Sequence, residues 1–295
     1  MKPTLSIGIA AYNEAENIGP LLSALLEQNI KSAHLVDIIV VSDASTDGTD
    51  AIVLSFSASH VELRRLPERR GSCNAQNIIT GSVKSDILVM LDADILPENE
   101  FFIEKLIQPI IEDSSVGLTS ATLLPATPRT FVEKILSRNH EWKKGVFSQI
   151  NQGNNLYTCF GPARAFSRKL YAMFQCPNDC PYDAISYMYC ATNHLRFVSV
   201  DYPRAVFRCP SNLSDHIKQS SRFLAGKDAV VKLFGQDAEH AYVIPRSLFI
   251  KSMVKEFLFH PILFGAFVVM SMIVRTHQKD SFVSTWDMAT SSKKI

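Results

Sequence analysis

The sequence predicts an α/β fold: a doubly wound, mostly parallel sheet with helices on both faces. Three observations lead to this prediction. Apolar runs alternate with helical patterns along the first hundred residues. The runs in "VDIIVVSDAS" and "SDILVMLDAD" are apolar almost throughout, as strands buried on both faces are. Polar residues follow the runs directly, and in such a sheet these residues meet at the edge where ligands bind.

The elements follow from these patterns in chain order. In the first half we expect alternating strands and helices, with strands in the stretches 4–14, 36–45, 61–66 and 86–92 and helices at 15–28, 46–57 and 71–83. The second half is less regular. There we expect helices at 127–150, 183–195 and 214–234, a loop and strand pair at 155–168, and one or two strands at 196–208. Internal repeats and an obvious linker are absent from the sequence.

The 295-residue chain has the length of one large domain, or of one domain with an appendage. Its 30 basic and 29 acidic residues give a net charge of +1, which argues against nucleic acid as a partner. Polar Asn13 and Glu14 come too early for a signal-peptide core. The six cysteines fit no common zinc spacing, so we expect buried free thiols in a reducing cytoplasm.

Four acidic side chains follow the predicted strands, and the fold brings them to one edge of the sheet. They are Glu14, Asp43, Asp92 and Asp94. Asp92 and Asp94 stand two residues apart at the end of a buried strand, and Pro97 is expected to end that strand. This concentration of negative charge is costly unless a divalent cation or a donor-rich ligand binds there. A solvated turn that caps the next helix is the simpler alternative for the pair.

Four segments, each at the end of a predicted strand, resemble the glycosyltransferases of family 2, which have the GT-A fold. They are "IAAYNEAENI", "VVSDASTDGT", "RRGSCNAQN" and "LDADILP". The resemblance is dense over the first 100 residues and continues in patches to Gly226. It implies a donor site of Ala11, Tyr12, Glu14, Asp43, Asp92 and Arg70, with Asp43 contacting the base. Ser72 stands where relatives carry Lys, and Arg70 is expected to substitute for it.

The resemblance also implies a divalent cofactor, Mn²⁺ or Mg²⁺, that neutralises the leaving diphosphate. Asp94 is then the direct ligand, and Asp92 contacts the donor ribose or assists the metal. An inverting transfer needs a base, which the resemblance places at Asp183. Tyr182 stands where relatives carry an acidic residue, and Asp179 competes for the role. Asp183 also suits a helix N-terminus without any catalytic role.

Two further segments resemble parts of the acceptor side. "KQSSRF" resembles the Gln-x-x-Arg-Trp motif of membrane-associated members, with Gln219 and Arg222 near the donor diphosphate and Phe223 in place of the tryptophan. The alternative is a solvated helix with a surface arginine. "CFGPARAFSR" resembles the acceptor loop. There Gly161 and Pro162 would shape the loop, and Arg164 or Arg168 would meet an acceptor phosphate unless they are surface residues.

The character of the chain changes after Pro245. Residues 246–260 are amphipathic, and residues 257–274 carry no formal charge apart from a protonated His260. This stretch is at the lower length limit for crossing a bilayer, so it either spans the membrane or lies in the interface; the alternative is a buried helix. We expect a catalytic domain at 1–243 (nucleotide half 1–100, acceptor half 101–243), membrane attachment at 244–275 and a polar tail at 276–295.

The sequence therefore predicts a membrane-attached inverting glycosyltransferase on the cytoplasmic side of the cell inner membrane. Its donor is a nucleotide-diphosphate sugar, with a UDP-sugar favoured, and its acceptor a lipid-linked or polysaccharide chain. Dimerisation is left open. Two alternatives remain. A sugar-phosphate nucleotidyltransferase has a similar architecture, but its glycine-rich entry loop is missing from "AAYNEAENIG". A non-catalytic relative would act as a membrane-bound partner, which the retained acidic residues oppose.

Overall fold

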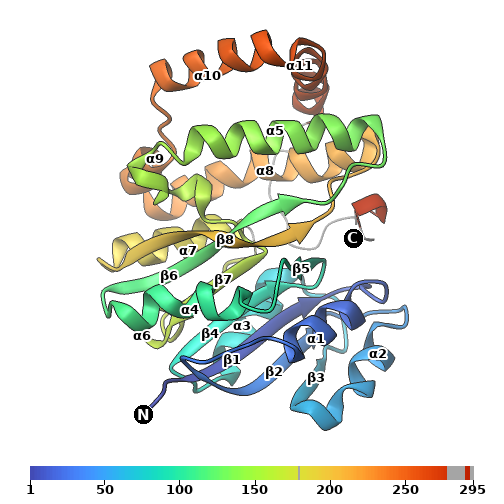
Figure 1. Cartoon of the computed structure of the whole chain (residues 1–295), viewed down its shortest axis with the longest axis vertical. Helices are drawn as coiled ribbons and strands as arrows, with labels where there is room; N and C mark the ends of the chain where they lie inside the picture. The colour runs from blue at the N-terminus through green and yellow to red at the C-terminus, as the bar shows by residue number, and fades with distance from the viewer. Residues whose placement is uncertain (179, 278–289, 293–295) are drawn as a thin grey trace.

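The computed structural model describes residues 1–178, 180–277 and 290–292; for residues 221–225 it describes the backbone only. An eight-stranded sheet runs through the molecule in the order β3-β2-β1-β4-β7-β6-β8-β5 (Figure 1). Four of its seven strand pairings are parallel and three are antiparallel. The predicted α/β class with a mostly parallel sheet is confirmed.

The N-terminal half is a parallel sheet of four strands, as predicted. They are β1 (Thr4–Ala11), β2 (His34–Ser42), β3 (Val61–Arg65) and β4 (Ile87–Asp92). The connecting helices are α1 (Ile18–Leu26), α2 (Thr49–Ser55), η1 (Ser57–Ser59) and α3 (Ser72–Ser82). In β1, Ala11 pairs with Ser42 and Ala10 pairs with Asp92. The residues that follow β2 and β4 therefore lie on either side of the end of β1.

The remaining four strands extend the sheet in mixed directions. They are β5 (Ile95–Pro97), β6 (Val116–Pro125), β7 (Ala163–Ser167) and β8 (Arg196–Phe207). β7 runs antiparallel to β4 and to β6, so β6 points the same way as β4. The strand at 87–92 ends at Asp92, and Pro97 closes the separate short strand β5, which pairs with β8. Pro97 therefore does not end the strand that carries Asp92.

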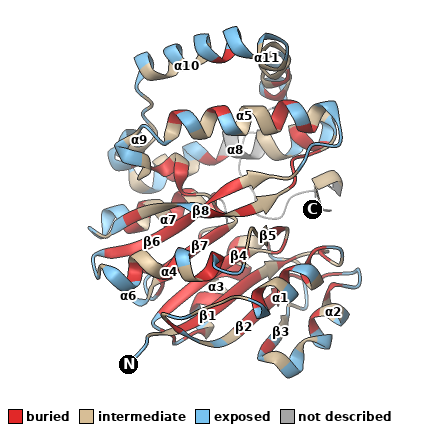
Figure 2. Cartoon of the chain, viewed as in Figure 1, coloured by how far each residue is buried: buried red, intermediate tan, exposed pale blue. Residues whose placement is uncertain are grey.

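Helices cover both faces of the sheet, because successive residues of each buried strand point to opposite sides. Ile38 and Val40 join α1, α2 and α4 (Phe102–Glu112) in one apolar cluster. Ile39 and Val41 join α3, α6 (Arg168–Tyr171) and α7 (Tyr182–Thr192) in the other. The strands are buried along most of their length (Figure 2). This double coverage explains why β2 and β4 read as nearly continuous apolar runs.

The elements that were not predicted include α4, β5 and β6. The expected loop and strand at 155–168 are a loop, with the 3₁₀ turns η2 (Asn151–Gly153) and η3 (Leu156–Thr158) in and before it, and the strand β7. A 3₁₀ turn offers no periodicity that a sequence can display.

A helical layer lies beyond the sheet, at the end of the molecule drawn uppermost in Figure 1. It contains α5 (Phe131–Phe147), α8 (Leu213–Phe234), α9 (Gln236–Ala241), α10 (Arg246–Phe259) and α11 (Pro261–Thr276). The described tail holds only the 3₁₀ turn η4 (Thr290–Ser292). The apolar stretch 257–274 is divided between α10 and α11 at His260. Within the described ranges, no helix has both the length and the apolarity to cross a membrane.

Candidate active site

Asp43 is fixed at the carboxyl end of β2 by three backbone hydrogen bonds. Its Oδ1 accepts from the Arg70 N–H at 2.7 Å and its Oδ2 from the Gly71 N–H at 2.8 Å. Its own N–H donates to the Ala11 carbonyl at 2.8 Å. Gly71 has a φ of 92°, which favours glycine where the chain turns into α3. The side chain is 4% exposed, so the loops around it are built to hold one carboxylate in one orientation.

The segment after β1 folds back onto α1 and α2. Asn13 has a φ of 53°, and the N–H of Glu14 donates to the Thr49 hydroxyl at 2.7 Å. Glu14 is 8% exposed and accepts from the Asn17 amide at 3.0 Å. Glu14 therefore holds the start of α1 in place.

Arg69 was missed in the sequence analysis. Its guanidinium lies 3.9 Å from the centre of the Tyr12 ring, a cation–π contact at the edge of the predicted donor site. Arg70 was chosen instead, and its guanidinium bonds Glu68 at the surface while its backbone holds Asp43. The two adjacent arginines indicated a cation near the donor site, but the sequence does not determine which of them faces Tyr12.

Asp92 is the last residue of β4 and Asp94 lies in the turn that follows, and both are partly exposed. The Asp92 N–H donates to the Pro162 carbonyl at 2.9 Å, and its Oδ2 accepts from the Tyr182 hydroxyl at 2.5 Å. Burial, with the charge of Asp92 and the bond to it, raises the pKa of Tyr182 well above its usual value. This contact joins the end of β4 to the first residue of α7.

The residues present fit a metal that is shared with a ligand. Among the described residues, no group of three or more His, Cys, Asp or Glu side chains is arranged to hold an ion alone. Mg²⁺ and similar ions commonly use one or two carboxylates, with phosphate and water oxygens completing the octahedron. Asp92 and Asp94 supply that pair of hard oxygen donors.

Asp183 stands in the first turn of α7, where its Oδ1 accepts from the Ala184 N–H at 2.8 Å. It is partly exposed and directly follows the tyrosine that bonds Asp92. The predicted base is therefore the chain neighbour of the residue that bonds Asp92, one of the two predicted metal ligands. The competing Asp179 lies outside the described residues.

The acceptor-loop prediction is corrected for Arg164. This side chain is 1% exposed, and its guanidinium donates to the Gly161 and Tyr182 carbonyls, the Ser186 hydroxyl and the Gln76 amide oxygen. It is turned into the protein and not toward an acceptor. Gly161 and Pro162 do lie at the site, because Pro162 bonds Asp92.

Arg168 is at the opposite edge of the sheet. It follows the end of β7, which runs antiparallel to β4, and its N–H donates to the Asp86 carbonyl just before β4 begins. The alternative that Arg168 contacts the acceptor at this site is therefore wrong.

The remaining predicted residues lie on α8. Gln219 is partly buried. Arg222 and Phe223 belong to the same helix, and their side chains are outside the described set. All six cysteines are buried free thiols. Burial raises the pKa of Cys190 to about 12 and that of Cys209 to about 11. Such thiols stay protonated near neutral pH and are unreactive as nucleophiles.

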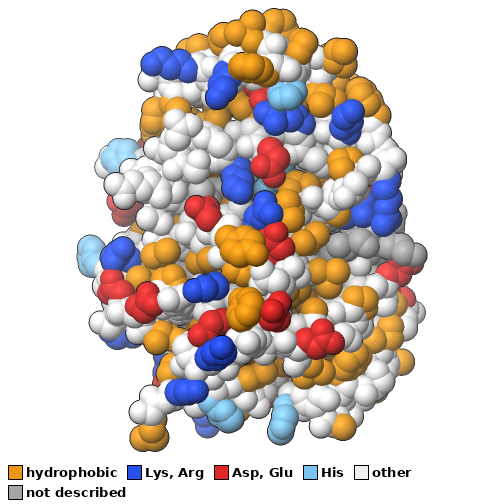
Figure 3. Space-filling view, in the orientation of Figure 1, with side chains coloured by type: hydrophobic (Ala, Val, Ile, Leu, Met, Phe, Trp, Pro, Cys, Tyr) orange, Lys and Arg blue, Asp and Glu red, His pale blue; other side chains and the backbone are white. Residues whose placement is uncertain are grey.

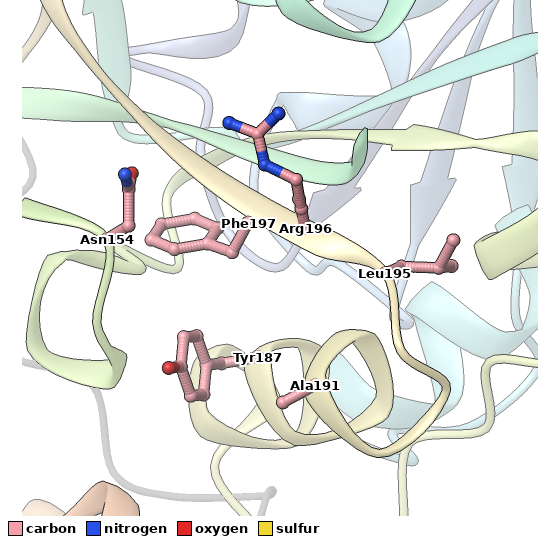
Figure 4. Close-up of a pocket in the computed structure, with 6 residues that line it drawn as sticks. All are labelled: Asn154, Tyr187, Ala191, Leu195, Arg196 and Phe197. Atoms are coloured by element: carbon pink, nitrogen blue, oxygen red, sulfur yellow. The ribbon is translucent and has the colours of Figure 1, made fainter. Parts of the chain in front are cut away.

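Two cavities lie away from the carboxylates. One of about 220 Å³ opens between α7 and the start of β8, where Tyr187 and Phe197 face each other (Figure 4). The start of β8 is at the sheet edge opposite to Asp92. A wider groove of about 470 Å³ lies between the end of β6, α5 and α11. The second groove is on the acceptor half, and its lining mixes cations with leucines: Leu124, Pro125, Lys134, Ser137, Arg138, Glu141, His260 and Leu263.

Comparison with protein families finds a match that covers most of the N-terminal part of the chain. The model of the family described as "Glycosyl transferase family 2" matches residues 6–174, which is more than half of the chain. Among curated proteins, glycosyltransferase AglE of Haloferax volcanii is 35% identical over 101 residues, 34% of this chain and 33% of AglE. The 4,4'-diaponeurosporenoate glycosyltransferase of Staphylococcus aureus is 26% identical over 172 residues, 57% of this chain and 45% of the relative. The chain thus spans about a third to a half of the length of these relatives.

Solved structures share the fold at low identity. The mannosyltransferase PcManGT of Pyrobaculum calidifontis, in complex with GDP-Man and Mn²⁺, has a TM-score of 0.61 at 18% identity, over 95% of this chain and 84% of that one. Glucosyl-3-phosphoglycerate synthase of Mycobacterium tuberculosis, with Mn²⁺, UDP and phosphoglyceric acid, has a TM-score of 0.57 at 16% identity, over 77% and 78%. These likenesses establish the GT-A fold.

Proposed function

Because the chain belongs to glycosyl transferase family 2, we propose that it transfers a sugar from a nucleotide-diphosphate donor to an acceptor hydroxyl with inversion. The observation that carries the proposal is that Asp43 and Asp92 lie at the carboxyl ends of β2 and β4, on either side of β1, while Asp183 directly follows the tyrosine that bonds Asp92. The first is fixed by backbone donors, and the other two are connected through Tyr182. A fold-level likeness alone would not assign an activity, whereas this arrangement gives each group a role.

In the proposed reaction Asp43 orients the donor by accepting from its base, and Tyr12 with Arg69 forms one wall of the donor site. Asp94 and Asp92 hold a Mn²⁺ or Mg²⁺ ion, which supplies charge neutralisation for the leaving diphosphate. Asp183 removes the proton from the acceptor hydroxyl. Gln219, Arg222 and Phe223 on α8 remain the proposed contacts to the diphosphate and the acceptor. Among donors, a UDP-sugar is the first to test.

We also propose that the hairpin of α10 and α11 attaches the protein to a membrane. Its inner side is fastened to α5 by an ion pair at 2.5 Å between Arg138 and buried Glu256. Trp142 adds ring contacts to Phe249, Phe264 and Phe267. The outer side exposes a set of large apolar side chains: Ile250, Val254, Phe257, Leu258, Phe259, Ile262, Val269 and Met272.

This outer side has the composition of an interfacial surface. Leu258 and Phe259 are each 71% exposed, which is unfavourable in water. Lys251, Lys255 and Arg275 are exposed on the same two helices, and such cations favour anionic headgroups. Apolar and basic side chains gather over this end of the molecule (Figure 3). Together they support residence on the cytoplasmic face of the inner membrane.

The groove beside the hairpin supports a lipid-linked acceptor. Lys134 and His260 offer donors to an anionic group, and Leu124 and Leu263 offer apolar surface. The groove lies at the end of β6 that faces the same way as the end of β4, so a lipid held there approaches the acceptor side of the site.

Donor hydrolysis by the full chain in detergent tests the proposed function. UDP-, GDP- and dTDP-sugars are screened with Mn²⁺ or Mg²⁺, comparing the wild type with Asp94→Ala and with Asp237→Ala, which changes an exposed residue of α9. We expect turnover of one donor that Asp94→Ala abolishes and Asp237→Ala retains. Nucleotide exchange products would indicate a nucleotidyltransferase. Absence of both turnover and metal-dependent UDP binding would indicate a non-catalytic relative.

A further inference from the structure

We propose that Tyr182 is a positioning residue for the metal site, holding the Asp92 carboxylate in the orientation that binds the ion. This inference rests on the proposed function. The contact is the hydrogen bond from the Tyr182 hydroxyl to Asp92 Oδ2, at 2.5 Å. A donor on one carboxylate oxygen fixes the rotation of the group, and partners of this kind typically change metal affinity 10- to 100-fold.

Two neighbouring residues pack against the phenol ring of Tyr182. Gly161 lies against it so closely that a Cβ atom there would come 2.4 Å from Cε2 of the ring. The Arg164 guanidinium lies 4.8 Å from the ring centre. A fixed ring carries its hydroxyl to a fixed point, so the bond to Asp92 does not depend on a freely rotating side chain.

Arg164 gives this support its rigidity. It bonds the carbonyls of Gly161 and Tyr182, so it ties the acceptor loop to the first turn of α7. Its remaining bonds reach Ser186 on α7 and Gln76 on α3. The fully buried arginine thus joins the helix that follows the Asp43-binding turn to the helix that carries Asp183. The Tyr182 hydroxyl connects these two helices to Asp92 through its hydrogen bond.

A tyrosine also suits the charge of this edge. Glu14, Asp43, Asp92 and Asp94 already gather there, and another carboxylate at position 182 would repel them. A phenol supplies a hydrogen-bond donor without adding charge. Tyr182, which stands where an acidic residue was expected, therefore donates to Asp92 without adding negative charge to the site.

Titration calorimetry of the full chain with Mn²⁺ in the presence of UDP tests the inference. We expect Tyr182→Phe to raise the Kd for Mn²⁺ by 10- to 100-fold, whereas the Tm of the metal-free protein should stay within a few degrees of the wild-type Tm. Tyr187→Phe is the matched control, because it removes a phenol from the same helix at the cavity beside Phe197. It should leave the Kd unchanged.

A double-mutant cycle separates positioning from a general structural effect. If Tyr182 acts through Asp92, adding Tyr182→Phe to Asp92→Asn should produce little further loss. Additive losses, or an unchanged Kd in Tyr182→Phe, would overturn the inference and leave the proposed function intact. A wild type that binds no Mn²⁺ with UDP would overturn both. If Tyr182→Phe fails to fold, Gly161→Ala replaces it, because the added methyl displaces the ring but retains its hydroxyl.

Discussion

Asp183 is the residue on which the chemistry of the proposed reaction depends most directly. It occupies the first turn of α7 beside Tyr182, where a carboxylate also stabilises the helix N-terminus. These two roles are separable, because an amide at this position keeps the shape and a hydrogen-bond acceptor but cannot take a proton.

We expect Asp183→Asn to lower kcat by about 10²- to 10⁴-fold, the range in which a positioned base contributes. UDP and Mn²⁺ affinities should stay at wild-type values, since the donor side is unchanged. Initial rates of sugar transfer, with calorimetry of UDP binding, measure both. A variant that transfers sugar at the wild-type rate would remove Asp183 from the mechanism and direct attention to Asp179.

Arg164 illustrates what sequence could and could not provide at this scale. The carboxylates could be placed because residues after parallel strands meet at one edge. Arg168 could not, because β7 is antiparallel to β4 and its end lies at the other edge. Arg164 lies at the near edge, but its side chain is buried among partners that come from α3 and α7. Strand direction is set by tertiary pairing, which a local pattern does not contain.

The burial of Arg164 also makes a stability prediction. Arg164→Met keeps most of the volume but leaves the Gln76 amide and Ser186 hydroxyl without that partner. We expect a loss of about 2 kcal/mol or more, because unsatisfied buried polar groups are costly. Urea unfolding measures it, with exposed Arg246→Met as the control. Equal midpoints for the two variants would contradict the structural role of Arg164.

At the scale of elements, α5 begins with a capping box that reaches across the fold. The Thr130 hydroxyl accepts from the Glu133 N–H, and Glu133 accepts in return from the Thr130 N–H. Glu133 also bonds Arg208, which follows β8, at 3.0 Å. The start of the helix is therefore fixed to the sheet. The sequence allowed α5 to be predicted from its apolar spacing, while the partner Arg208 came from 75 residues away.

This cap makes stability depend on pH. Burial raises the pKa of Glu133, but the bonds from the Arg129 and Thr130 N–H groups and from Arg208 outweigh it, and the net pKa is lowered. A carboxyl whose pKa is lower in the folded than in the unfolded state stabilises the protein at pH values above its unfolded-state pKa, which is about 4.3 for glutamate. That contribution is lost as the pH falls through the folded-state value.

We expect Glu133→Gln to destabilise the protein by about 2 kcal/mol at pH 7, the range for hydrogen bonds to charged groups. The difference from the wild type should shrink as the pH falls below the unfolded-state pKa of about 4.3, because unfolding is then favoured by proton uptake at Glu133. Urea unfolding from pH 7 to pH 3 measures the trend. Exposed Glu239→Gln on α9 should change little at any pH. A constant difference would show that the charge of Glu133 has no role.

At the scale of the whole molecule, the site and the proposed membrane surface belong to one structure. Asp92 ends β4 in the N-terminal half, and the turn with Asp94 leads into β5, which pairs with β8 of the other half. The halves 1–100 and 101–243 therefore describe proposed roles within one continuous sheet. Composition could indicate the apolar C-terminal region, but not which of its faces docks on α5.

We expect the chain to cosediment with vesicles that contain anionic phospholipid, and Leu258→Glu with Phe259→Glu to reduce the partition coefficient at least tenfold. Burying each such side chain contributes about 1.5–3 kcal/mol, so losing two exceeds that threshold. Leu54→Glu is the control, since Leu54 is 57% exposed on α2 at the far end of the molecule (Figure 1). Equal losses in both variants, or no vesicle binding by the wild type, would contradict the proposed surface.

The close contact between Gly161 and Tyr182 restricts how this protein can change over time. A side chain at position 161 forces the ring at position 182 to move, because the two would occupy the same space. A lineage that exchanges the tyrosine for a smaller residue releases that restriction, and alanine or serine can then appear at 161 without displacing a neighbour. In the reverse order, a side chain at 161 would first displace the ring from Asp92. The two positions, 21 residues apart in sequence, therefore have a preferred order of substitution.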